Sequence, residues 1–600
     1  MAAKPIPGNV LPVRAQSALQ AFAMQLGAAA LVCVLIATSY FRSKRARRRL
    51  PPGPPGLPLI GNLHQLPMTH QERTFAQWGT RYGDVVYARV LNRAALILNR
   101  ASTARALLER RGAKYSGRPY TTFVRDMCAP ATSADALTML KSADRTLRRM
   151  HPWRRHRRWF QTALQARNAL NAHEPLQYAE VQNLLRDLLR EPEGVLKHVK
   201  RYVAALMLGV AYGYSPSSMD DEFIAMAEDA MQIITESGGP STMLVDFIPI
   251  MKYLPAWMPG MEVKRSGLRA RRLIRDMERI PLERVKREMA EGTARPSIAT
   301  VLLEEAANTG SLDEAEEREI RSVLGVIWYG YSTYHIIQGV ASRLAQRPAK
   351  TTTVLTTFIL MMVVHPEVLQ KAQREVDSVV GDSRLPNFSD RPALPYLEAV
   401  LKEVYRWLAP VPLGVPHQLT EDDHYEGFDM PAGSMVLANI WAMSRDEALY
   451  SDPDTFDPER FMGLSEAKSE ETDPRRIVFG FGRRLCPGRL LADSSIFLAA
   501  ANIISAFDVR TSRTQDGQEI PLVPSFTTGA TPKAIRVRYP PQVREGSGTD
   551  AGGGRDIRMS GRVFGPGLSV YVILTGVGRL RARFEHGVDT GDAAWPDTSK

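Results

Sequence analysis

The sequence predicts a mainly α-helical protein with small β-sheets, an α+β fold, that carries one N-terminal transmembrane helix. Apolar residues at spacings of three and four, the pattern of amphipathic helices, occur in residues 176–189, 223–236, 263–280 and 368–380. Residues 82–90 and 94–98 alternate or run apolar on either side of a turn, which predicts a β-hairpin. Residues 18–41 form a long apolar run without charge.

Length and composition favour one large domain with appendages. The chain has 600 residues, of which 44% are hydrophobic and 24% charged, and no Pro/Gly/Ser-rich linker divides its interior. These values are ordinary for a globular protein with a large core, so we expect one large domain at residues 67–540. Cys33, Cys128 and Cys486 are widely spaced and share no disulfide or zinc pattern, which favours a reducing compartment.

The apolar run at residues 18–41 is long enough to cross a bilayer of about 30 Å as a helix. We therefore expect a membrane anchor that follows a short lumenal N-terminus at residues 1–17. A cleaved signal peptide is the alternative, but most of the nearby basic residues follow the run. Six of them lie between Arg42 and Arg49, and because positive residues stay cytosolic, the rest of the chain is expected to face the cytosol.

The net charge of +13 is concentrated at the N-terminus. Residues 1–50 contain eight Lys or Arg and no acid, which leaves +5 for the remaining 550 residues. This mild excess does not indicate a nucleic-acid partner. The segment at 42–66 is a basic and Pro-rich linker whose prolines predict a short rigid spacer, with an ordinary linker or a protein-binding segment as the alternative.

The loop Phe479-Gly-Phe-Gly-Arg-Arg-Leu-Cys-Pro-Gly488 delivers one cysteine to the start of an apolar run. Gly480 and Gly482 permit backbone conformations closed to other residues, so the loop can fold tightly. A thiolate at a helix N-terminus beside Arg483 and Arg484 has a depressed pKa and can ligate a soft or borderline metal. A buried cysteine in a Gly-rich turn is the simpler interpretation.

This loop resembles the cysteine loop of the cytochrome P450 family at every position that the family pattern Phe-x-x-Gly-x-Arg-x-Cys-x-Gly specifies. The resemblance implies the cytochrome P450 fold and haem b, with Cys486 as the axial thiolate that pushes electron density toward the iron. It also places Phe479, Gly482 and Arg484 at the cofactor.

A basic cluster around residues 153–159 contains aromatic residues as well, which is a pattern that nucleic-acid-binding proteins show. Trp153 and Arg157 lie one helical turn apart, however, so an indole donor and a guanidinium can grip the same carboxylate. This pair resembles the family's contact with a haem propionate. The other arginines can attract an acidic electron-donor protein.

Glu403 and Arg406 are three residues apart on a helix that we expect to begin near Pro395. Alone such a pair is weak, since surface salt bridges of this kind are common. Arg460 follows in a proline-bounded turn, and in the family the three residues form one buried network. The resemblance therefore implies a structural triad of Glu403, Arg406 and Arg460.

Three further segments are candidates for the substrate cavity. Residues 411–417 are predicted to run extended past the haem, with His417 near a propionate or in a simpler structural role. Residues 523–528 are a second lining candidate by position only. The Pro-rich residues 247–259 resemble a substrate gate at the membrane-facing entrance of the family, with a plain surface loop as the alternative.

The sequence departs from the family at the centre. The family carries a small-Gly-x-acid-Thr-Thr pattern that organises the protons for dioxygen, whereas here Pro348, Ala349 and Lys350 precede the Thr pair. Residues 329–350 are polar and aperiodic, and we expect them to be a genuine insertion, the mark of an enzyme without a dioxygen proton relay, or a translated intron. We favour the intron, because the codons for residues 328–330 can resemble a splice donor.

The resemblance implies monooxygenation of a small, largely apolar organic substrate, with electrons from NADPH through a separate flavoprotein reductase. It also implies the endoplasmic reticulum membrane and a place in fungal secondary metabolism or xenobiotic oxidation. A haem-thiolate isomerase or dehydratase and a catalytically impaired haem-binding protein or membrane scaffold remain open. Residues 541–600 begin with a Gly-rich stretch and are expected to be a flexible or weakly docked tail, in which residues 567–578 suit a short strand or helix.

Overall fold

The computed structural model describes residues 49–67, 69–128, 150–236, 245–332, 350–511, 535–537 and 570–575. The predicted anchor at residues 18–41 and the lining candidate at residues 523–528 lie outside these ranges. So does most of the predicted tail.

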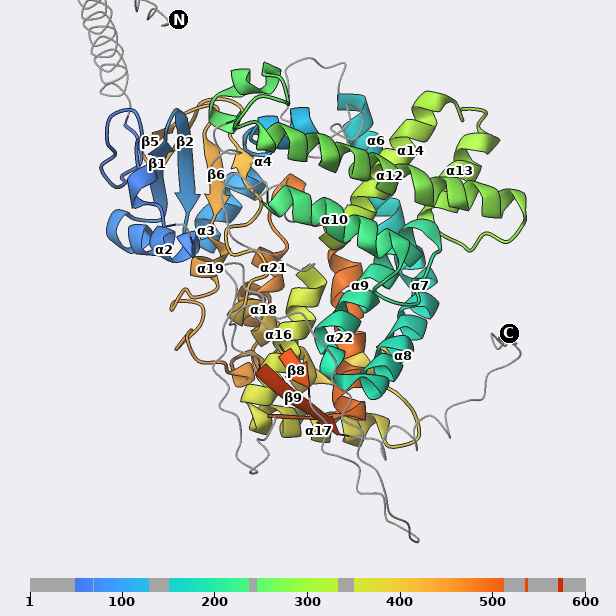
Figure 1. The fold of residues 1–600 in the computed structure, drawn as a ribbon. Helices are drawn as coiled ribbons and strands as arrows, with labels where there is room; N and C mark the ends of the chain where they lie inside the picture. Colours follow the sequence, from blue (N-terminus) through green and yellow to red (C-terminus); the bar gives the residue numbers. More distant parts are fainter. Residues whose placement is uncertain are drawn as a thin grey trace, which may run out of the picture.

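The described chain is a helical body with a small sheet at one side, which Figure 1 shows at the left. The N-terminal part contains α2 (Gln71–Tyr82), α3 (Ala101–Ala104), η2 (Arg105–Arg110), α4 (Gly112–Tyr115) and η3 (Phe123–Cys128). The middle contains α6 (Met150–Leu164), α7 (Arg167–Ala172), α8 (Glu174–Arg190), α9 (Val195–Tyr212), α10 (Glu222–Glu236), η6 (Pro249–Tyr253), α12 (Glu262–Ala290), α13 (Ile298–Asn308) and α14 (Glu314–Ser332). The rest contains α16 (Lys350–Val364), α17 (Pro366–Val380), η7 (Phe388–Ala393), α18 (Pro395–Trp407), α19 (Ile440–Met443), η8 (Pro458–Phe461), α20 (Glu466–Thr472), α21 (Arg475–Val478), η9 (Gly482–Arg484) and α22 (Arg489–Ala506).

The main sheet joins segments from both ends of the described chain. Its strands are β1 (Val85–Val90), β2 (Arg93–Leu98), β6 (Met435–Ala438) and β3 (His417–Gln418), in the order β1-β2-β6-β3. β1 and β2 form the predicted hairpin, with Val90 opposite Arg93. A separate hairpin pairs β4 (Asp423–Tyr425) with β5 (Phe428–Met430).

The predicted Pro-rich spacer lies against this sheet. The backbone amide of Tyr87 donates to the carbonyl of Pro52, and Gly61 forms an antiparallel β-bridge with Val90 beside the hairpin turn. A Cβ on Gly53 would lie 1.9 Å from the backbone carbonyl oxygen of Tyr87, so this close contact requires glycine. Residues 50–61 are therefore packed on the folded domain.

The core lies between the central helices, chiefly α9, α16 and α22. The Tyr202 hydroxyl on α9 donates to the carbonyl of Ser495 on α22 over 2.9 Å, which joins the two helices deep inside. Among the described helices α22 alone passes a length and hydropathy test for a membrane span, but 72% of it is buried, as expected of a core helix. A bend of 107° separates the apolar α16 from α17.

The helices predicted from periodicity are present with shifted ends. Residues 176–189, 223–236 and 368–380 lie in α8, α10 and α17. The helix expected at residues 263–280 continues to Ala290 through Pro281, because Pro281, Leu282 and Val285 all face the core. Burial of this apolar face offsets the cost of a proline inside the helix.

The predicted anomalous segment divides two helices. α14 continues to Ser332, four residues into the range expected to be irregular, and α16 begins at Lys350. Residues 333–349 lie outside the described residues. The carboxyl end of the chain supplies a sheet of order β7-β9-β8, built from β7 (Asp508–Thr511), β9 (Val570–Thr575) and β8 (Ile535–Val537). β9 lies where a short strand or helix was expected.

Candidate functional site

The cysteine loop connects α21 to α22 and closes on itself. The Cys486 amide donates to the carbonyl of Phe479 over 3.0 Å, so the two ends of the turn meet. Gly480 and Gly482 have φ values of 85° and 54°, in the left-handed region that glycine adopts without strain. Cys486 is a free, partly exposed thiol two residues before the N-cap of α22.

Gly482 is required by a neighbour as well as by its backbone angle. A Cβ at this position would lie 2.2 Å from the Leu108 carbonyl oxygen in η2. The loop therefore lies directly on η2, a contact that sequence reasoning did not anticipate. This close contact with η2 restricts where the loop can lie.

Two aromatic residues of the loop pack against other elements. Phe481 is buried in the cluster beneath the sheet. Phe479 is half-buried, with its ring centroid 5.7 Å from that of Tyr405 on α18. Both side chains are anchored by other elements, so they contribute to fixing the loop.

α6 approaches the loop from the other side. Arg157 donates to the carbonyl of Leu485, the residue before Cys486, over 3.3 Å, and Gln165 donates to the carbonyl of Pro487 over 3.2 Å. Trp153 lies on α6 one turn before Arg157, as expected, and its side chain is outside the described part of the structure. The pKa of Arg157 is lowered, chiefly by burial and also by the nearby charge of Arg489. Cys486 acts in the opposite direction, but its effect is smaller than that of burial.

Arg484 and His417 meet near the start of β3. Arg484 donates to the carbonyl of Ser116 over 2.9 Å, and His417 Nδ1 lies 2.8 Å from the carbonyl of Tyr115, which assigns the proton to Nδ1. Burial, together with the charges of Arg118 and Arg484, lowers the pKa of His417 well below its usual value, so the imidazole is neutral. Burial and the charge of Arg157 lower the pKa of Arg484 to about 10.

Arg118 is a member of this group that the sequence did not reveal. Its side chain is buried and donates to the carbonyls of Val415 and Pro416 over 2.9 and 2.7 Å. A lone Arg-Pro pair carries no pattern of its own, and Arg118 is 298 positions from Pro416. Only the fold brings them together.

The result is a concentration of positive charge beside the cysteine loop. The charge of Arg157 contributes to the lowered pKa of Arg484. The charges of Arg118 and Arg484 contribute in the same way to the lowered pKa of His417. Such a donor set suits a ligand that carries carboxylates, because an anion would relieve the repulsion. The two propionates of a haem have this chemistry.

Glu403, Arg406 and Arg460 come together as one network. Arg406 binds Glu403 through two hydrogen bonds of 2.7 Å, and neither side chain is exposed. Arg460 Nε lies 3.3 Å from the same carboxylate and donates to backbone carbonyls of residues 451, 452 and 455. Arg406 also donates to the carbonyls of Ser444, Pro453 and Thr455. The network fixes the segment that leads into the cysteine loop.

Residues 411–417 are not extended as expected. Gly414 has a φ of 59° and donates to the carbonyl of Val411 over 3.0 Å, so the segment turns before β3. The prolines restrict their neighbours, but the glycine between them permits the turn.

On α16, Thr352 and Thr357 bury hydroxyl groups that have no hydrogen-bond partner among the described residues.

Comparison with known proteins identifies the family. The family model described as cytochrome P450 matches residues 51–537. Cytochrome P450 monooxygenase 176 of Postia placenta is 40% identical over 502 residues, covering 84% of this chain and 91% of that protein. Cytochrome P450 monooxygenase 136 of the same fungus is 41% identical over 520 residues, or 87% and 92% of the two chains. Tryptamine 4-monooxygenase of Psilocybe cyanescens is 33% identical over 516 residues, or 84% and 96%.

These matches confirm the resemblance that the cysteine loop predicted, and they extend it to most of the chain. The mainly helical architecture with small sheets agrees with it. A haem cofactor follows from the family. The protein therefore belongs to the cytochrome P450 family and is a monooxygenase of that family.

Proposed function

We propose that the protein is a membrane-anchored haem-thiolate monooxygenase that oxidises a small, largely apolar organic substrate with O2 and electrons from NADPH. The observation that carries the proposal is the closed loop between Phe479 and Cys486, which presents a partly exposed thiol whose charge interacts with Arg157 on α6. Bound haem b supplies the iron at which dioxygen is activated. Cys486 is the proposed axial ligand of that iron.

The positive group beside the loop is the proposed seat of the propionates. Arg118, Arg157 and Arg484 would neutralise the two carboxylates, with Trp153 as a further donor from α6. His417 is neutral and donates from Nδ1 to Tyr115, so its other nitrogen is available as an acceptor toward a protonated propionate or water. Phe479 and Gly482 would keep the loop close to the cofactor.

The electrons are proposed to come from NADPH through a separate flavoprotein reductase. Arg158 is exposed one residue beyond Arg157, on the helix that touches the loop. Positive charge at this place suits the association of an acidic partner protein, an effect that salt weakens.

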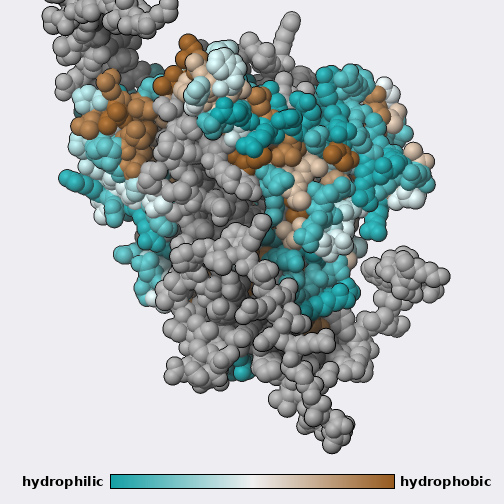
Figure 2. Space-filling model, in the orientation of Figure 1, coloured by the Kyte–Doolittle hydropathy of each residue, from teal (hydrophilic) through white to brown (hydrophobic). Residues whose placement is uncertain are grey.

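The membrane is the proposed location, with residues 18–41 as anchor and the endoplasmic reticulum as compartment. Support comes from exposed apolar side chains at one end of the molecule, where Figure 2 shows hydrophobic patches. They lie on the Pro-rich segment and around η6: Leu57, Leu59, Ile248, Ile250, Tyr253, Leu254, Trp257 and Met258. Arg93 at the hairpin turn donates a hydrogen bond of 2.7 Å to the carbonyl of Asp246, which connects the sheet to the segment that leads into η6. Residues 247–259 are thus the proposed gate between membrane and substrate cavity.

The substrate class rests on the relatives. One of them is named for the oxygenation of tryptamine, a small organic molecule, and this supports the type of reaction. Secondary metabolism or xenobiotic oxidation is the proposed setting. The test is a reconstitution with a fungal NADPH-dependent reductase and a panel of apolar compounds. Product that requires NADPH, O2 and reductase together supports the proposal.

A second candidate is a haem-thiolate isomerase or dehydratase, or an impaired haem-binding protein. It is favoured by the sequence just before Thr351, where Pro348, Ala349 and Lys350 stand in place of the family's glycine and acid. Product that persists without reductase and O2 would indicate the isomerase, and spectral change without turnover the impaired protein. Transcript reads that skip residues 329–350 would remove the reason for both.

A further inference from the structure

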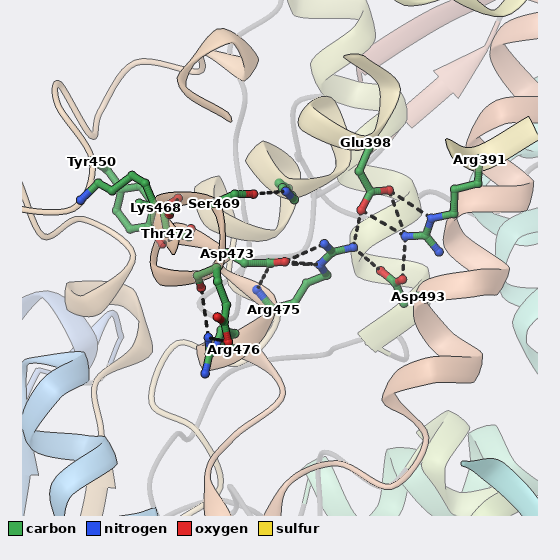
Figure 3. A network of polar contacts seen from close by, with 12 residues as sticks. Arg391, Glu398, Tyr450, Lys468, Ser469, Thr472, Asp473, Arg475, Arg476 and Asp493 are labelled. Carbon is green, nitrogen blue, oxygen red and sulfur yellow. Dashed lines mark hydrogen bonds and ion pairs between the residues drawn. The ribbon is translucent and has the colours of Figure 1, made fainter. Parts of the chain in front are cut away.

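A second network of partly buried charges lies around Glu398 on α18 (Figure 3). Arg391 on η7 donates to Glu398 over 2.9 Å and to Asp493 over 2.7 Å. Arg475 donates to Glu398 over 2.5 Å, to Asp493 over 3.2 Å and to Asp473 over 2.6 Å. Each of these five side chains is only about a fifth to a quarter exposed.

The network joins the two stems of the cysteine loop. Arg475 is the first residue of α21 and stands four residues before Phe479, while Asp493 lies in α22, seven residues after Cys486. Their side chains meet at Glu398 on α18. The chain that enters the loop and the chain that leaves it are therefore tied to one rigid helix.

The charges depend on one another. Burial alone would raise the pKa of Glu398, but Arg475 and Arg391 hold it below the usual value. Because burial opposes the charged state of each group, the network persists only if its partners stay together. Removing Arg475 would leave the carboxylates of Glu398 and Asp493 facing each other with Arg391 as their shared cation.

The network also reaches the ring that supports the loop. The hydroxyl of Tyr405 is buried, and its pKa is raised by burial and by the charge of Asp493. The Tyr405 ring lies against Phe479, whose carbonyl accepts the Cys486 amide. Arg391 stacks over the Phe497 ring of α22 at 4.9 Å. A shift at Arg475 is therefore transmitted to both ends of the turn around Cys486.

We propose that Arg475, through Glu398 and Asp493, is a positioning residue that holds the Cys486 thiolate on the haem iron. This rests on the proposed role of Cys486 as ligand. The triad of Glu403, Arg406 and Arg460 fixes the segment before α20, whereas the Arg475 network closes the stems of the loop itself. Loss of Arg475 loosens the thiolate before the rest of the protein unfolds.

The chain offers a matched control in the next residue. Arg476 lies on the same short helix but pairs with Glu470 at the surface, where their side chains are 45% and 68% exposed. Arg475→Gln and Arg476→Gln remove the same charge from adjacent positions. Only Arg475→Gln removes a side chain that binds Glu398 and Asp493.

The experiment uses purified, full-length, haem-loaded protein in detergent. Total haem, helical circular dichroism and the reduced carbon monoxide spectrum are measured during mild heating, below the midpoint of global unfolding. We expect Arg475→Gln to lose thiolate ligation about tenfold faster or more, because Glu398 and Asp493 lose the cation that ties the two stems of the loop together. Arg476→Gln should follow the wild type, and Arg475→Lys should lie between the two.

A purely structural role predicts another result. The yield of Arg475→Gln would fall, but the haem that remains would keep the wild-type rate of thiolate loss, and that result overturns the proposal. If Arg475→Gln yields no protein, Asp493→Asn gives the same test, since it weakens the clamp while leaving the bond from Arg475 to Glu398; an unchanged rate there also overturns the proposal. A wild-type protein without thiolate ligation would instead overturn the proposed function.

Discussion

Arg157 on α6 donates a hydrogen bond to the carbonyl of Leu485, the residue directly before Cys486. This one contact joins two segments 328 positions apart and places a guanidinium beside the proposed thiolate. Arg157 therefore has two functions in our account. Its side chain binds a backbone carbonyl of the loop, and its charge contributes to the proposed propionate site.

Arg157→Ala should weaken haem retention. The variant loses both the bond to Leu485 and a charge-assisted contact to a propionate, and contacts of that kind contribute about 1.5–3 kcal/mol. We expect haem to transfer to apomyoglobin at least about tenfold faster. The control is Arg158→Ala, which changes the exposed neighbour. Equal transfer rates in the two variants would contradict the assignment.

Gly482→Ala should prevent formation of the site. The new methyl would lie 2.2 Å from the Leu108 carbonyl and at a φ of 54°, so both sterics and backbone conformation oppose it. We expect no haem-loaded protein. The control is Gly433→Ala, where φ is 81° and no atom lies within 4 Å of the added Cβ. That variant has only the conformational cost of about 1 kcal/mol, and it should keep the full haem content.

Glu403→Gln should destabilise the fold. The substitution leaves Arg406, which is completely buried, without its anionic partner, and breaking a buried pair costs about 3–5 kcal/mol. Denaturant unfolding of the haem-loaded protein measures this loss. Glu283→Gln removes an exposed partner of Arg279 on α12 and should have no measurable effect. A small effect of Glu403→Gln would remove the triad from the account.

Asp246 should make stability depend on pH. Burial raises its pKa to about 6, although the Phe123 amide and Arg93 act in the opposite direction. The folded state therefore favours the neutral carboxyl, and stability falls as the pH rises from the ordinary value of 3.8 to about 6. Asp246→Asn resembles the neutral form, so the amount by which its melting temperature exceeds that of the wild type should be larger at pH 8 than at pH 5. An equal difference at both pH values would show that Asp246 does not titrate in this way.

The local parts of the fold and site could be predicted from the sequence. The hairpin, the existence of α8 and α10, and the left-handed glycines of the cysteine loop depend on nearby residues, whose patterns are visible in the chain. The family resemblance added the expected roles of Arg157, Arg484 and the triad. Arg157 and Arg484 lie in or against the loop and the triad forms one network, while their roles at a cofactor stay predictions.

The remaining parts depend on contacts between distant segments. Arg118 reaches His417, and Leu108 requires Gly482, only because the sheet brings η2 and β3 beside the loop. The turn at Gly414 was missed because neighbouring prolines suggested an extended chain. Arg475 and Asp493 each resemble an ordinary surface charge in the sequence, and their meeting at Glu398 follows from helix packing. Periodicity carries no information about such pairs.

The central claim is that Cys486 is the thiolate ligand of a haem. Its most direct test is the reduced carbon monoxide difference spectrum of the full-length protein in microsomes, compared with Cys486→Ser and Cys128→Ala. Cys128 is the other free cysteine among the described residues, and it is buried at the end of η3. We predict the long-wavelength Soret band of thiolate ligation in the wild type and in Cys128→Ala, and its loss in Cys486→Ser. The same band in Cys486→Ser, or its absence from the wild type, would contradict the account.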